Sequence, residues 1–123
     1  MSNFLKHTST INYTLDSIEE TKPTQTSDVM FNNNITKSWI NTYGINFLEE
    51  FNQVVSQNNL DDFLRILIKE NKHRNKTIEL EDAIFLAINT IHLKNKEVTT
   101  EQMMFIVGKS FVWSIQEKKR RLF

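Results

Sequence analysis

Three histidines and four pairs of adjacent acids are the residues of this chain that could support metal binding or acid–base catalysis. His7, His73 and His92 lie far apart, and none has a second type of metal ligand four residues away. Adjacent carboxylates on a helix do not face each other, so they are poorly placed to share a proton. We therefore expect no catalytic residue, no metal site and no cofactor, and we do not expect an enzyme. The acid pairs are Glu19-Glu20, Glu49-Glu50, Asp61-Asp62 and Glu81-Asp82.

The glycine and cysteine content excludes further classes of site. The chain has no cysteine, so it holds no disulfide, thiolate nucleophile or zinc–thiolate centre. Gly44 and Gly108 are its two glycines, and two isolated glycines cannot form a glycine-rich loop around a phosphate. The sequence therefore predicts no nucleotide-binding loop.

Two basic clusters contain the residue types that bind phosphate groups. One lies in a predicted turn and the other follows the last predicted helix. Together they could neutralise several phosphates of a nucleic acid. The simpler interpretation, which we prefer, is that cations near helix C-termini complement the helix dipole. The members are Lys69, Lys72, Arg74 and Lys76 in the first cluster, and Lys118, Lys119, Arg120 and Arg121 in the second.

Large apolar residues near the C-terminus form the main candidate for a partner-binding surface. The last helix is predicted to begin at Thr99 and to run through Ile115, and its apolar residues cover more than one face. Methionine and aromatic residues are common on adaptable binding surfaces. The candidate partner-binding residues are Met103, Met104, Phe105, Phe111 and Trp113.

The spacing of apolar residues predicts a mainly α-helical fold that positions these groups. Residues 1–34 are predicted to form a polar N-terminal arm, either extended or folded as a short β-hairpin, because Ile11, Tyr13 and Leu15 alternate with polar residues. Residues 35–123 are predicted to form a small bundle of four or five helices. Its stripes include Phe51, Val54 and Val55, then Leu64 and Leu67, then Leu80, Ala83, Ile84, Ala87 and Ile88.

A neutral total conceals a division of charge along the chain. Residues 1–62 carry eight acids and three bases, a net charge of −5, and residues 63–123 carry twelve bases and seven acids, a net charge of +5. Such a separation of charge between the two halves favours binding to another protein, to a second copy of the chain or to a polyanion. The start of the chain lacks the pattern of a secretory signal, and no apolar run approaches the ~20 residues that span a bilayer. We therefore expect a cytoplasmic protein.

Residues 59–121 also resemble a known family. Three segments carry the resemblance: NLDDFLRILIKENK, TIELEDAIFLAINTI and TTEQMMFIVGKSFVWSIQEKKRR. Their order, the acidic start of the second segment and the basic end of the third are similar to the helical region of phage tail assembly chaperones from low-G+C hosts. The resemblance implies a small non-enzymatic protein of virion assembly that escorts a tape-measure protein in the cytoplasm of a bacterial host cell and self-associates.

Taken together, these observations predict a protein–protein interaction module without catalysis, such as an assembly chaperone or adaptor of a phage or other mobile element. A head-to-tail homo-oligomer follows from the opposite charges of the two halves. Two alternatives stay open. One is a small nucleic-acid-binding protein that uses residues 69–76 and 118–121, and the other is an inhibitor or immunity-type protein.

Overall fold

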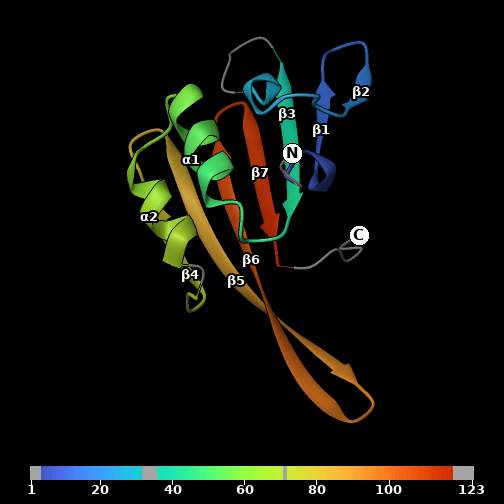
Figure 1. Cartoon of the computed structure of the whole chain (residues 1–123), viewed down its shortest axis with the longest axis vertical. Coiled ribbons are helices and arrows are strands. Elements are labelled where there is room, and N and C mark those ends of the chain that lie inside the picture. The colour runs from blue at the N-terminus through green and yellow to red at the C-terminus, as the bar shows by residue number, and fades with distance from the viewer. Residues whose placement is uncertain (1–3, 32–35, 71, 118–123) are drawn as a thin grey trace.

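The computed structural model contains one mixed β-sheet with two α-helices packed on it (Figure 1), and it describes residues 4–31, 36–70 and 72–117. Within these residues the strands follow the order β2-β1-β3-β7-β6-β5-β4 across the sheet. The strands are β1 (Thr8–Tyr13), β2 (Ile18–Thr21), β3 (Lys37–Tyr43), β4 (Lys76–Glu79), β5 (Ala83–Lys94), β6 (Glu97–Gly108) and β7 (Phe111–Gln116). The helices are α1 (Leu48–Gln57) and α2 (Phe63–Glu70), with short 3-10 turns η1 (Leu5–His7) and η2 (Thr26–Asp28).

The predicted helical bundle is therefore wrong. The two segments predicted to form the last two helices instead form β5, β6 and β7, and residues near Trp39 form β3. Apolar side chains occupy both faces of these central strands, which removes the period-2 alternation that identifies a strand with one solvated face. The helices α1 and α2 do lie where the spacing predicted helices.

The N-terminal residues are part of the sheet. Strand β1 pairs antiparallel with β2 and also antiparallel with β3, with Ile11 opposite both Glu20 and Trp39. Strand β3 then runs parallel to β7. The boundary predicted at residue 34, between an arm and a helical domain, lies outside the described residues.

The core lies between the two helices and one face of the sheet, here called the covered face. In this core the ring of Phe51 from α1 meets the ring of Trp113 from β7 with centroids 5.7 Å apart. Leu64, Leu67 and Ile68 of α2 are buried in the same core. The parallel pair β3 and β7 needs a long crossover, and α1 and α2 belong to that crossover.

Strands β5 and β6 extend well beyond the other strands as a two-stranded ribbon (Figure 1). Residues 89–94 pair with residues 97–102, beyond the last residue of β6 that pairs with β7. Asn95 and Lys96 join the strands with φ of 52° and 66°, the backbone of a tight hairpin turn of type I′. The ribbon is thus a regular hairpin that projects from the body of the sheet.

Gly108 is required by the tight connection from β6 to β7. A Cβ at this position would lie 2.7 Å from the Cδ1 and Cζ atoms of the buried Phe111 ring. We expect Gly108→Ala to lower the free energy of unfolding by about 1–3 kcal/mol, because the ring must move within a packed core. Urea unfolding measures the change. Lys109→Ala, an exposed control, should change stability by less than about 0.5 kcal/mol, and equal effects of the two substitutions would contradict this explanation.

Candidate functional site: the open face of the sheet and the base of the ribbon

The face of the sheet opposite α1 and α2, here called the open face, carries an unusual row of apolar side chains. Pairing places five such residues side by side across five neighbouring strands. Most are half-buried, and Ile84 is 39% exposed. This set is called the apolar row and consists of Ile11, Trp39, Val112, Val107 and Ile84.

Acidic residues end the apolar row at both edges of the sheet. Glu20 of β2 lies opposite Ile11, and Glu79 of β4 lies opposite Ile84, and both glutamates are exposed. At ~4.8 Å per strand, the apolar part is roughly 19 Å wide. Leu86 and Phe105 extend it by one further pair on β5 and β6. The apolar row is therefore bounded by an acidic residue at each edge of the sheet, and the hydrogen-bonded side chains of Asn41 and Ser114 lie beside it on the open face.

The five residues predicted to bind a partner are divided between the two faces. Met104, Phe111 and Trp113 lie on the covered face and are 1%, 3% and 0% exposed, so they belong to the core. Met103 and Phe105 point to the open face, where Phe105 is half-buried and Met103 is 4% exposed. On a helix these two side chains would diverge, whereas on a strand they share a face because they are two residues apart.

Of the two basic clusters, the first is exposed at the end of α2, in the following loop and at the start of β4. Lys72 and Arg74 of this cluster line a pocket of about 400 Å³ together with Asn89, Gln102 and Glu117. The second cluster, residues 118–121, lies outside the described residues. Since it supplies four of the five excess positive charges of the second half, the described part of that half has a net charge of only +1.

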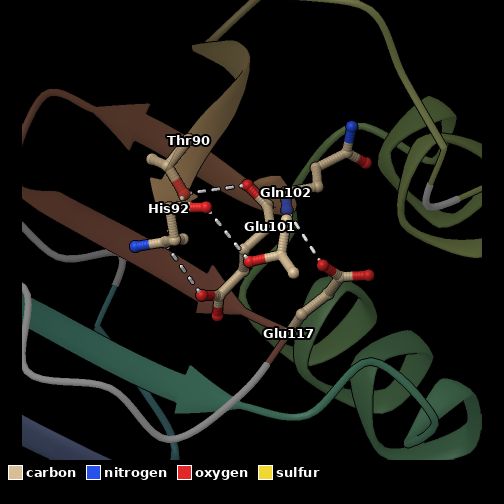
Figure 2. A network of polar contacts seen from close by, with 6 residues as sticks. Thr90, His92, Glu101, Gln102 and Glu117 are labelled. Atoms are coloured by element: carbon tan, nitrogen blue, oxygen red, sulfur yellow. Dashed lines mark hydrogen bonds and ion pairs between the residues drawn. The ribbon is translucent and has the colours of Figure 1, made fainter. Parts of the chain in front are cut away.

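Hydrogen bonds at the base of the ribbon connect β6 to the loop after α2 and to Glu117, the residue after β7. Figure 2 shows the bond to Glu117. The Gln102 side chain accepts from the His73 backbone N–H at 3.2 Å and donates to the His73 carbonyl at 2.6 Å. Its own backbone N–H donates to Oε2 of Glu117 at 2.9 Å. These bonds fix where the ribbon leaves the sheet.

His92 and Glu101 form a diagonal pair on the open-face side of the ribbon, with Nε2 and Oε2 3.5 Å apart (Figure 2). The Thr90 hydroxyl donates to the Glu101 carbonyl at 3.0 Å, and it also lies 3.1 Å from His92 Nε2. The arrangement joins neighbouring strands. Because the Thr90 hydroxyl and the Glu101 carboxylate both lie at Nε2 of His92, the three groups do not form a hydroxyl–imidazole–carboxylate relay, which uses both ring nitrogens. His7 and His73 lie in other parts of the fold, and no group of three potential metal ligands comes together among the described residues.

Comparison with known proteins identifies the fold but no family. No family model matches the sequence, and no curated protein matches it. Among solved structures, full-length CmaX has a TM-score of 0.69 at 10% identity over 92% of this chain and 35% of the CmaX chain. The cytoplasmic domain of ZntB from Vibrio parahaemolyticus has a TM-score of 0.67 at 9% identity over 90% of this chain and 44% of that domain. These likenesses establish a shared fold.

The CorA magnesium transporter of Methanocaldococcus jannaschii has the same fold, with a TM-score of 0.60 at 10% identity over 90% of this chain and 32% of the transporter. This chain thus spans less than half the length of each of these structures. None of them is described as an enzyme. Among the described residues, no helix has both the length and the apolar character needed to cross a bilayer.

The observed fold also removes the structural basis of the resemblance to phage tail assembly chaperones. That resemblance depended on three successive helices over residues 59–121, and in the described part of this range only α2 is helical. The three structures compared above include a magnesium transporter and a cytoplasmic domain, and none of the three is a phage assembly protein. We therefore do not retain the virion-assembly interpretation.

The sequence analysis missed the apolar row because its members come from five strands that are distant in sequence. The available signal was local: Ile84, Val107 and Val112 are β-branched, and such residues are common in strands. Which of these β-branched residues lie side by side on one face depends on the pairing between strands that are distant in sequence.

Proposed function

We propose that this chain is a non-catalytic, cytoplasmic protein-association domain that binds another protein through the open face of its sheet. The apolar row is the observation that carries the proposal. A sheet face exposed to water normally presents polar side chains, whereas this face presents a contiguous apolar surface that a partner would cover.

The acidic edges of the open face define the chemistry of that partner. An apolar stripe flanked by lysine or arginine residues would bury the centre of the face and pair with Glu20 and Glu79 at its edges. Complementary charge of this kind sets the orientation of the partner and its rate of association more than the affinity.

The structural relatives support a role within a larger protein or assembly. CorA is a magnesium transporter, and the ZntB structure is that of a cytoplasmic domain. Because the matched fold makes up less than half of each of these chains, we propose that it serves here as an associating unit of a larger system. The nucleic-acid and inhibitor alternatives stay predictions.

Site-specific photo-crosslinking in the native cell tests this proposal. A photoreactive phenylalanine analogue at Phe105 or at Trp39 should form adducts with one or a few proteins, because both positions lie on the open face. Leu15, which is fully exposed in the turn between β1 and β2, provides the matched control. Mass spectrometry identifies the adducts. If the open-face positions crosslink no more than position 15, the proposed function is wrong.

A further inference from the structure

We propose that one partner of the open face is a second copy of this chain, whose ribbon tip inserts into a pocket at the far end of β5 and β6. This inference depends on the proposed function, because the pocket lies at one end of the open face. Two features of the structure, an unpartnered apolar ribbon and an acidic pocket, support it.

The ribbon carries apolar side chains on one face. Leu93 and Val98 are directly paired across the two strands, and Ile91 lies two residues before Leu93 on the same face. They are 74%, 68% and 73% exposed, respectively. This face lies beyond the helices that cover the body of the sheet (Figure 1). An isolated two-stranded hairpin is marginally stable in water, so a cluster of exposed aliphatic side chains on it is a surface suited to burial against a partner.

The turn of the ribbon is positively charged. Lys94 and Lys96 flank the tip, and Glu97, which lies opposite Lys94, leaves it with a net positive charge. Apolar side chains and a basic turn therefore lie within a few residues of each other. The surface that fits this tip combines apolar walls with acidic residues.

A pocket of about 390 Å³ at the opposite end of the same strands has that combination. Ile84 and Val107 line it with apolar surface. Its acidic residues outnumber the one lysine, Lys109, by three to one. The acidic residues are Glu79, Glu81 and Asp82.

The contact between tip and pocket must join two molecules. Strand β5 runs without a break from Ala83, at the pocket, to Lys94, at the tip. At ~3.4 Å per residue the two ends are roughly 37 Å apart, so the tip of one molecule cannot reach its own pocket. Tip-to-pocket contact uses two different surfaces and is therefore head-to-tail, which generates a ring or an open filament.

A charge-swap experiment on the whole chain tests this interface. One variant reverses the charge of the tip, with Lys94→Glu and Lys96→Glu. A second variant reverses the charge of the pocket, with Glu81→Lys and Asp82→Lys. Either variant alone brings like charges together, so we expect its self-association to weaken by about tenfold or more. Mixing the two variants pairs an acidic tip with a basic pocket and should restore association. Sedimentation velocity over a concentration series at low salt measures all three samples.

The matched control reverses the charge of two exposed lysines away from the open face, with Lys6→Glu in η1 and Lys69→Glu in α2, and should associate like the unmodified chain. Three results would overturn the inference: a monomeric unmodified chain at every concentration, charge-reversed variants that associate normally, or a mixture that does not recover. Recovery in the mixture also shows that both variants are folded. If crosslinks from the open face reach other proteins while the purified chain stays monomeric, the self-association fails and the proposed function stands.

Discussion

Trp113→Ala is expected to lower the free energy of unfolding by about 3–5 kcal/mol, which is a large part of the roughly 5–15 kcal/mol that stabilises a typical domain. Trp113 is fully buried in the centre of the covered face. Its ring lies 5.7 Å from that of Phe51 and 5.8 Å from that of Phe31. The substitution removes these contacts and leaves a cavity that rigid neighbours on the sheet and α1 cannot fill. Urea unfolding monitored by circular dichroism measures the loss.

The loss also includes a buried hydrogen bond. The indole Nε1–H of Trp113 donates to Oγ1 of Thr42 at 3.2 Å, and that hydroxyl lies 3.0 Å from the Thr8 hydroxyl. This chain of contacts connects β7, β3 and β1 across the sheet. Truncation at Trp113 therefore weakens the link between the N-terminal strands and the centre of the core.

The second tryptophan provides a matched control for this prediction. Trp39 lies on the open face and is half-buried, and its Nε1–H donates to the Ser114 hydroxyl at 3.0 Å. Trp39→Ala should lower the free energy of unfolding by about 1–2 kcal/mol, because less of the Trp39 ring than of the Trp113 ring is packed against other side chains. Equal costs for the two substitutions would mean that the open face is packed as tightly as the core, which would also contradict its assignment as a binding surface.

Local sequence patterns were sufficient to locate α1 and α2 but not to identify the central strands. Each helix has an apolar stripe with polar residues around it, as expected for a helix with one buried face. Residues 83–91 satisfy the same helical spacing because apolar side chains occur on both faces of β5. Asn95-Lys96, between two long apolar segments, is the local signal that favours a hairpin of two strands, because asparagine is common at the first position of a type I′ turn.

The candidate site could not be predicted from the sequence for a related reason. A helical model put Met103 and Phe105 on diverging sides of one partner-binding helix, whereas the strand places them together on the open face and puts Met104 in the core. The apolar row exists only because Ile11 and Trp39 join residues from the far end of the chain through the parallel pairing of β3 and β7. Neither composition nor spacing reports pairing over such a sequence separation.

Asn58→Ala is the second substitution for which a large loss of stability is expected, about 3 kcal/mol, although it removes only a small side chain. Asn58 follows α1 and is 2% exposed. Its Oδ1 accepts from the Phe31 backbone N–H at 2.9 Å, and its Nδ2 donates at 2.9 Å to the carbonyls of Val29 and of Val54. Alanine would remove all three buried hydrogen bonds, each of which contributes about 1 kcal/mol. It would also leave the Phe31 N–H without that partner, whereas the Val29 and Val54 carbonyls still accept from the Gln57 side chain and from the backbone N–H of residue 58. The one unsatisfied donor costs about 1–3 kcal/mol before relaxation or water entry.

Asn52→Ala is the matched control, because Asn52 is an exposed residue of the same helix. This control should change stability by less than about 0.5 kcal/mol. Native-state hydrogen exchange gives a second, local readout: the Phe31 amide should be protected in the unmodified chain and should exchange much faster in Asn58→Ala. Gln57 still donates to the carbonyls of Thr26 and Val29, so the preceding turn should stay attached to α1. If the Phe31 amide stays equally protected and stability is unchanged, Asn58 does not hold this segment over the core.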